Sequence, residues 1–298
     1  MPDQAEKLRT LVTTASPAAA GEGLPMIVVT GGRAGVGATT VALNLAAVLA
    51  DRGERVLLVD GAQQRNEMLE PAGLRRDVEY GLSDVLSGKC AVGEAIVQGP
   101  AGVRMLLNRR NPRATRDFSR NEQQRLLTEL QSLDESLDLI VLDAGRRVTL
   151  SSQRIWSRAR LVVLVTTPDD AAVLDAYAAI KQSAAEAVPL PMRLLVNQAE
   201  SDAAATDAQR RMEAACQRFL SRPLPVLPAL PRHLASEFLG APSAPRVWEM
   251  PNTPFGHAAL WLGRAVSDLL SMEDAGCGDE GLCFTSLPAS RIPNPAFC

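Results

Sequence analysis

The sequence predicts an α/β fold in which a mostly parallel sheet carries helices on both faces. Short runs rich in Val, Ile and Leu alternate along the chain with longer helical patterns. Strands that are apolar on both faces are typical of parallel sheets, because helices cover each face. Hydrophobic residues make up 46% of the chain and aromatic residues only 4%. This composition suits aliphatic side chains packed between helices and a sheet.

The chain is expected to divide into four segments. The pattern "DQAEKLRTLV" predicts a short helix within 1–12, and "TTASPAAAGEG" predicts a flexible linker at 13–24. The main α/β domain is expected at 25–272. The remaining residues, 273–298, have no hydrophobic period and many Gly and Pro, so a disordered tail is expected there.

The main domain contains both strand-like apolar runs and segments with the hydrophobic period of a helix. Apolar, β-branched-rich runs predict strands at 26–30, 55–60, 102–107, 137–143, 160–167 and 193–198, with a shorter candidate at 225–230. Helical periodicity is found at 39–51, 82–87, 121–133, 151–158, 170–186, 204–220 and 257–271. Strands that alternate with helices in this way predict parallel pairing.

Composition also excludes several classes of function. The net charge of −3 argues against binding of nucleic acid through overall charge. The five Cys residues form no paired framework, and the chain starts with a polar segment rather than a secretory signal. No apolar stretch approaches the length of about 20 residues that spans a membrane. We therefore expect a reduced, cytoplasmic protein.

One segment departs from this balance of charge. Residues 104–125 contain seven Arg and two acidic residues. A solvated surface is the simpler interpretation, and the alternative is a patch that binds an anionic partner.

The stretch "GGRAGVGATT", residues 31–40, lies between an expected strand and an expected helix. Residues 32–39, here called the phosphate loop, match the pattern G-x-x-x-x-G-K-[ST] except that Ala38 replaces the lysine. Backbone N–H groups of such a loop and of the following helix bind phosphate. The hydroxyl of Thr39 is a candidate Mg²⁺ ligand. The candidate nucleotide-binding residues are Gly32, Arg33, Gly35, Val36, Gly37, Ala38, Thr39 and Thr40.

The lost lysine removes a positive charge from the β- and γ-phosphates. A unit charge at about 4 Å is worth roughly 4 kcal/mol at an effective dielectric of about 20. If most of this energy acted in the transition state, its loss would slow hydrolysis about a hundred- to a thousand-fold. Binding is less affected, because the backbone amides and Mg²⁺ contribute independently.

The phosphate loop resembles that of the MinD/ParA class of P-loop ATPases, K-G-G-x-G-K-[ST]-[ST]. Arg33 takes the place of the first, signature lysine, Ala34 replaces a glycine, and Ala38 replaces the second lysine. In that class the signature lysine reaches the nucleotide across an ATP-bound dimer. The resemblance therefore implies a homodimer in which Arg33 keeps a positive charge of different shape.

Two further motifs resemble this class. In "LLVDGAQQ", Asp60 matches the first acid of the D-x-D motif, while Ala62 replaces the aspartate that orients water. In "LIVLDAGRR", Asp143 matches the Mg²⁺-linked acid, and Arg147 replaces the switch glycine. The resemblance implies a Mg²⁺ site formed by Thr39, Asp60 and Asp143, with Asp60 the sole residual catalytic candidate.

Two strand ends resemble the base-binding region of the class. "VNQ" makes Asn197 a candidate adenine contact, and "LPRH" places His233 where the class has an acid.

Within the class, the chain resembles the FlhG (FleN) group that controls flagellar number. "DAYAAIK" at 175–181 and "DQAEKLR" at 3–9 are similar to motifs of that group. The N-terminal motif stimulates an FlhF-type GTPase there. The resemblance implies that Gln4 reaches the partner's nucleotide site, while Leu8 and Val12 anchor the helix.

These observations together predict a nucleotide-binding regulator. It is expected to bind ATP or ADP with Mg²⁺ weakly, to hydrolyse ATP slowly or not at all, and to act through an FlhF-like GTPase and flagellar basal-body or regulatory proteins. Two alternatives stay open: a working ATPase in which Arg33 supplies the missing charge, and a scaffold for polar pilus or secretion assembly that resembles CpaE and TadZ. Autonomous membrane binding is not expected, because the last segment lacks a basic amphipathic helix, and nucleic-acid binding is not expected either.

Overall fold

The computed structural model describes residues 24–62, 68, 72, 74, 78–108, 119–133, 136–145, 158–184, 190–232 and 245–275. The helix expected within 1–12 and most of that at 151–158 lie outside these residues, as do Arg147 and His233.

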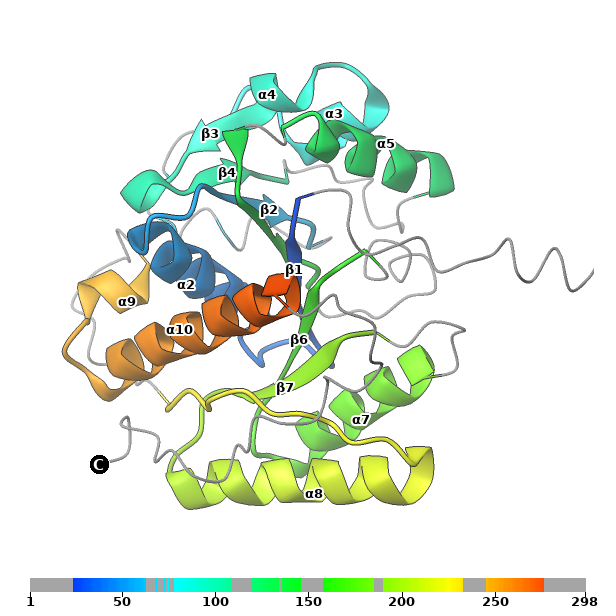
Figure 1. Cartoon of the computed structure of the whole chain (residues 1–298), viewed down its shortest axis with the longest axis vertical. Coiled ribbons are helices and arrows are strands. Elements are labelled where there is room, and N and C mark those ends of the chain that lie inside the picture. The colour runs from blue at the N-terminus through cyan, green and yellow to red at the C-terminus, as the bar shows by residue number, and fades with distance from the viewer. Residues whose placement is uncertain are drawn as a thin grey trace, which may run out of the picture.

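A seven-stranded sheet forms the centre of the described structure, in the order β3-β4-β2-β5-β1-β6-β7 (Figure 1). All neighbouring strands are parallel except β3 and β4. The strands are β1 (Met26–Gly31), β2 (Val56–Asp60), β3 (Ile96–Gln98), β4 (Arg104–Leu106), β5 (Leu139–Asp143), β6 (Leu161–Thr166) and β7 (Met192–Val196). The expected mostly parallel sheet is confirmed.

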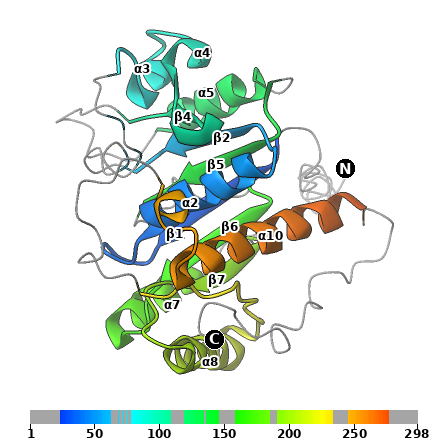
Figure 2. The same cartoon turned by 90° about the vertical axis from the view of Figure 1, so that its left-hand side faces the viewer.

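Helices cover both faces of the sheet (Figure 2). One face is covered by α2 (Ala38–Asp51), α9 (Arg246–Glu249) and α10 (Pro254–Ala275). The other is covered by α3 (Leu82–Ser87), α4 (Val92–Ala95), α5 (Arg120–Gln131), α7 (Asp170–Ala184) and α8 (Asp202–Leu220). Strand side chains alternate between the two cores: Ile27 packs toward the first face and Val28 toward the second.

Two short runs differ from the sequence-based expectation. The run at 225–230 is not a strand: it forms only isolated bridges, Leu194 to Val226 and Ala199 to Pro231. Prolines at 225, 228 and 231 lack the N–H that a continuous ladder requires. The run at 102–107 forms a strand only over β4, because residues 100–102 form a 3₁₀ turn after the hairpin strand β3.

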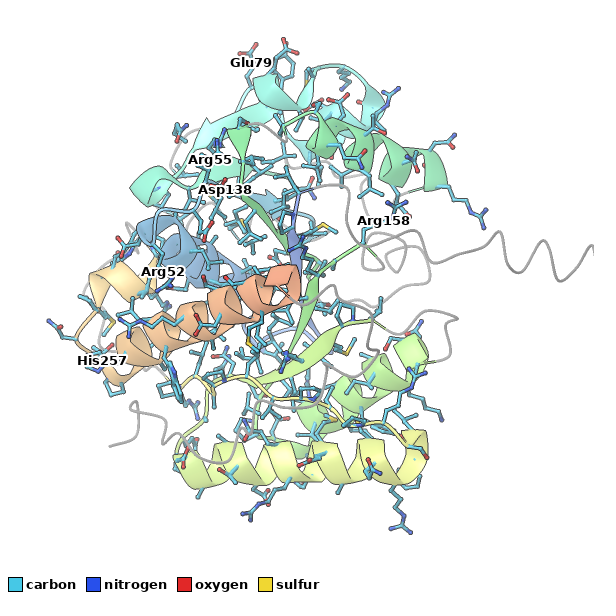
Figure 3. The ribbon with its side chains drawn as sticks, viewed as in Figure 1. Arg52, Arg55, Glu79, Asp138, Arg158 and His257 are labelled. Carbon is cyan, nitrogen blue, oxygen red and sulfur yellow. The ribbon has the colours of Figure 1, made fainter. Side chains whose placement is uncertain are left out.

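An ion pair joins the starts of β2 and β5 (Figure 3). Arg55 donates to Asp138 from Nε at 3.0 Å, from Nη2 at 2.6 Å and from its backbone N at 2.8 Å. These hydrogen bonds lower the pKa of Asp138 to about 2.

Replacing Asp138 with asparagine is therefore expected to lower the melting temperature at pH 7 by about 1–3 °C, since exposed pairs contribute little. The pKa of Asp138 is lower in the folded chain than the value of about 3.9 in the unfolded chain. Its contribution is thus present above pH 4 and lost as pH falls through 2. Melting curves of both proteins should converge over that interval, and a constant difference would contradict this assignment.

Candidate functional site

The phosphate loop joins the end of β1 to the start of α2. Gly35 and Gly37 have φ of +84° and +87°, a left-handed conformation that glycine adopts without strain. Gly37 is also the N-cap of α2 and supplies no side chain to its first turn. The N–H groups at the start of α2 therefore face the loop, in the arrangement by which helix N-termini bind anions.

Two amide side chains that follow β7 hold the phosphate loop from one side. Asn197 Nδ2 donates to the carbonyl of Val36 at 2.8 Å, and Gln198 Nε2 donates to the carbonyl of Gly35 at 2.9 Å. In a trans peptide the N–H points opposite to the C=O. The N–H groups of Val36 and Gly37 thus point away from this amide clamp, which we define as Asn197 and Gln198.

The amide clamp explains why residue 37 is glycine. A Cβ at Gly37 would lie 2.4 Å from Asn197 Nδ2. Asn197 is buried, at 5% exposure, and its structural role is to support the loop. The adenine contact expected of Asn197 stays a prediction. The role of Gln198 was missed, because the sequence alone does not reveal that the end of β7 lies beside the phosphate loop.

A buried acidic pair stands at the ends of two adjacent strands. Asp60 ends β2 and Asp143 ends β5, and the two residues are opposite each other in the parallel ladder. Asp60 Oδ1 accepts from the backbone N of Ala62 at 3.2 Å, and Asp143 Oδ1 accepts from that of Gly145 at 2.9 Å. The carbonyl of Gly145 in turn accepts from the N of Gly31 at 2.9 Å. This bond connects the acidic pair to the start of the phosphate loop.

The donor atoms of this region suit Mg²⁺. The described residues contain no group of three or more His, Cys, Asp or Glu side chains able to hold a metal ion. Mg²⁺ does not need such a group, because one or two carboxylates plus phosphate oxygens and waters complete its shell. The buried pair Asp60 and Asp143, with the hydroxyl of Thr39 on α2, fits this requirement.

Two positions in the site carry alanine where the motifs described above have a lysine or an aspartate. Ala38 begins α2 and packs into the core at 8% exposure. Ala62 follows β2 at 7% exposure, and its carbonyl accepts from Asn108 Nδ2 at 2.9 Å. Asn108 Oδ1 accepts from Ser83 Oγ at 3.2 Å. Asn108 was missed by the sequence analysis, although it directly follows an expected strand.

Arg33 is directed toward α7. Its guanidinium lies 3.7 Å from carboxylate oxygens of both Asp169 and Asp175. The pKa of Asp169 is lowered mainly by the hydroxyl of Thr167, then by the backbone N of Ala172, with a smaller effect of Arg33. The Arg33 side chain is 43% exposed, so these pairs are weak. Sequence analysis did not find the two carboxylates, because their approach depends on how α7 packs.

Gly32 is the point at which the phosphate loop touches α7. A Cβ there would lie 2.6 Å from the backbone N of Ala176 and 2.8 Å from the carbonyl carbon of Asp175. Backbone atoms in a helix cannot move aside as a flexible side chain can. Gly32 is therefore required for the close packing that brings Arg33 to its two carboxylates.

Comparison with known proteins identifies this arrangement. A family model described as an AAA domain matches residues 25–181, just over half of the chain. The chain belongs to this family. Within it, the protein is a member of the MinD/ParA class of P-loop ATPases, close to the FlhG/FleN group. The class predicted from the phosphate loop and the two acidic motifs is thus confirmed.

Three relatives illustrate the similarity. The antiactivator FleN of Pseudomonas aeruginosa is 28% identical over 262 residues, which cover 81% of this chain and 93% of FleN. The flagellum site-determining protein YlxH of Helicobacter pylori is 28% identical, and the match spans 61% of this chain and 62% of YlxH. The structure of the septum site-determining protein MinD of Pyrococcus horikoshii, complexed with Mg-ADP, has a TM-score of 0.65 at 21% identity and covers 84% of this chain and 98% of its own.

Among the residues that the structure describes, no helix is both long enough and apolar enough to cross a bilayer.

Proposed function

We propose that this MinD/ParA-class protein is a regulator that binds a Mg-nucleotide weakly and hydrolyses it slowly or not at all. One observation carries the proposal: the phosphate loop keeps its shape through the amide clamp, while Ala38 and Ala62 place methyl groups at the positions of charge and water orientation. Binding of phosphate and its hydrolysis use different parts of such a site, and only the binding parts are kept.

Binding would be achieved by backbone and carboxylate groups. The N–H groups of Val36 and Gly37, together with the N-terminus of α2, would face the β-phosphate. Thr39, Asp60 and Asp143 would hold Mg²⁺, which neutralises phosphate charge when it is bound. The affinity is expected to be low, because no lysine charge adds to these neutral dipoles.

Hydrolysis lacks two contributions in this site. Ala38 offers no charge to the γ-phosphate, and the methyl of Ala62 cannot accept a hydrogen bond from an attacking water. Asn108, the polar side chain beside Ala62, already donates to the Ala62 carbonyl. The alternative of a working ATPase would require Arg33 to leave Asp169 and Asp175 and to reach a nucleotide, as it would across a homodimer.

Calorimetry checks the binding. Titration with ADP or ATP is expected to give dissociation constants in the range of about 0.1–1 mM with Mg²⁺ and at least tenfold weaker binding without it. Asp143→Asn should remove the Mg²⁺ dependence, whereas Asp138→Asn, at the opposite end of β5, should leave it intact. Absence of any heat or thermal shift at millimolar nucleotide would contradict the proposal.

The cellular role that we propose is control of flagellar number or placement. FleN and the flagellum site-determining protein YlxH are among the relatives, and "DQAEKLR" resembles the activator motif of the FlhG group. The partner would be an FlhF-type GTPase, with flagellar basal-body or regulatory proteins downstream. In a GTPase, a correctly placed glutamine orients the attacking water, and Gln4 would supply it.

A peptide of residues 1–14 is expected to raise GTP hydrolysis by the cognate FlhF-type protein at least tenfold. Gln4→Ala should abolish most of this gain without loss of binding, and Leu8→Asp should prevent binding. Measured phosphate release, with binding followed by fluorescence polarisation, separates the two effects. If the full chain stimulates the GTPase equally well without residues 1–12, the motif has no role in activation.

A further inference from the structure

The side chain of Asn108 connects the region of the acidic pair to the helix α3. It donates from Nδ2 to the carbonyl of Ala62 at 2.9 Å and accepts at Oδ1 from Ser83 Oγ at 3.2 Å. These bonds select one orientation of the amide group, because the opposite orientation would turn Oδ1 toward a carbonyl oxygen. Asn108 therefore holds the Ala62 carbonyl from a fixed position.

The parallel pairing of β2 with β4 places Asn108 at the carboxyl edge of the sheet. Val59 lies opposite Leu106 in the ladder, so the two strands end together. Asn108 therefore emerges beside the turn that follows β2, and Figure 2 shows β4, β2 and β5 as neighbours. The N–H of Leu82, at the start of α3, donates to the carbonyl of Leu107 at 2.8 Å, which brings α3 to the same edge.

Ala62 is the residue through which Asn108 acts on the acidic pair. The backbone N of Ala62 donates to Asp60 Oδ1 at 3.2 Å, and its carbonyl accepts from Asn108. Ala62 also lies against the turn that follows Asp143, because a Cβ added at Gly145 would be 3.3 Å from the Cβ of Ala62. The position of this one residue thus affects the orientation of the Asp60 carboxylate.

Carboxylate orientation matters more for Mg²⁺ than for Ca²⁺. Mg²⁺ demands near-ideal octahedral geometry, whereas Ca²⁺ accepts variable numbers and positions of oxygen ligands. Groups that orient a metal-ligating side chain typically change metal affinity by about 10–100-fold. Asn108 acts one step further out, through the backbone of Ala62, so we expect a smaller effect of about three- to tenfold.

We propose that Asn108 is a positioning residue for Mg²⁺ in the nucleotide site: it holds Ala62, and Ala62 holds Asp60. Ser83 contributes by fixing the orientation of the Asn108 amide. This inference rests on the proposed function, because it takes Asp60 and Asp143 as the carboxylates that hold Mg²⁺ beside a nucleotide. The preference of the site for Mg²⁺ over Ca²⁺ then depends on a side chain that acts through the protein backbone.

The variant Asn108→Ala removes both hydrogen bonds and tests the proposal. The dissociation constant of ADP, measured by NMR titration of the full chain with saturating Mg²⁺, should rise about three- to tenfold. The value measured with Ca²⁺ should change less than about twofold, because Ca²⁺ tolerates a displaced carboxylate. Equal losses with the two ions would indicate a general disturbance of the site and would overturn the proposal.

Ser83→Ala tests whether Ser83 acts through Asn108. Alone it should raise the dissociation constant of Mg-ADP about twofold, and it should add nothing to Asn108→Ala, since residues that act in series are not additive. Ser87→Ala is the matched control: Ser87 Oγ, on the same helix, donates to the carbonyl of Asp84 at 3.0 Å, so the affinity should not change. Additive losses from Ser83→Ala and Asn108→Ala would contradict the proposed order.

Hydrogen exchange followed by NMR separates this inference from the proposed function, because it requires no nucleotide. In Asn108→Ala the amide of Ala62 should exchange about tenfold faster, since its bond to Asp60 is no longer held in place. The amide of Ala144, which donates to the carbonyl of Val29 at 2.9 Å, should be unaffected.

The two measurements distinguish the possible failures. If the natural chain binds no nucleotide but exchange at Ala62 accelerates, the positioning of Asp60 stands and the proposed function falls. If Mg-ADP binds and its affinity does not respond to Asn108→Ala, the proposed function stands and this inference falls. Unchanged exchange at Ala62 would also overturn the inference, whether or not nucleotide binds.

Discussion

The double variant Ala38→Lys, Ala62→Asp is expected to hydrolyse ATP about a hundred- to a thousand-fold faster than the natural chain, whose rate should be near background. The lysine returns a charge worth roughly 4 kcal/mol at about 4 Å and an effective dielectric of about 20, and each ~1.4 kcal/mol of barrier is a factor of ten. The aspartate returns an acceptor for the attacking water beside the Asp60–Asp143 pair. Phosphate release measured at saturating ATP and Mg²⁺ checks this result.

Single variants separate the two contributions. Ala38→Lys alone should tighten ATP binding but restore only part of the turnover, because no side chain then accepts from the attacking water, and Ala62→Asp alone should change neither greatly, because the charge on the γ-phosphate stays unmet. Adding Asp143→Asn to the double variant should return the rate to background. If the natural chain already turns over ATP as fast as the double variant, the working-ATPase alternative holds, and Arg33→Ala should then abolish the activity.

Gly32→Ala is expected to destabilise the protein by about 3 kcal/mol, toward the upper end of overpacking effects, or about 6–12 °C in melting temperature for a domain of this size. The added Cβ would overlap the backbone of α7 at 2.6 Å. Because α7 must move away, Arg33 should also lose Asp169 and Asp175. Thermal melts monitored by circular dichroism measure the loss.

Two alanine variants serve as matched controls for Gly32. Gly93 in α4 has no neighbour within 4 Å of an added Cβ and an ordinary φ, so Gly93→Ala should be neutral or slightly stabilising. Gly35 is equally open but has a φ of +84°, so Gly35→Ala should cost about 1 kcal/mol through strain alone. A loss at position 32 no larger than that at position 35 would show that α7 accommodates the added Cβ, and would contradict the close contact assigned to Gly32.

The fold was predictable where an element was long and strongly patterned. The strand β1 and the helix α2 follow from an apolar run and from helical periodicity on either side of a glycine-rich turn. Elements of three or four residues, such as β3, α4 and α9, complete no hydrophobic period and were missed. At 225–230 the apolar pattern correctly indicated burial, but the strand predicted there was wrong, because proline interrupts the hydrogen bonding of this segment.

The site was predictable only in the parts that one sequence motif contains. The phosphate loop follows from glycine spacing, and Asp60 and Asp143 were each found by the resemblance of their own motif, while their pairing across β2 and β5 is seen in the structure. By contrast, the support of the loop by Gln198 spans more than 160 residues. The ion pairs of Arg33 depend equally on long-range packing, which no local pattern encodes.

The amide clamp has a consequence for the dynamics of the loop. Its two donors stand at the end of β7, the last strand of the described sheet, and sheet edges open with less free energy than central strands. We therefore expect the phosphate loop to open together with this edge, to which the clamp ties it, rather than with the central strand β1. In hydrogen exchange, the N–H groups of the loop and of β7 should lose protection together. Nucleotide that slows exchange at Val36 and Gly37 should slow it at this distant edge as well.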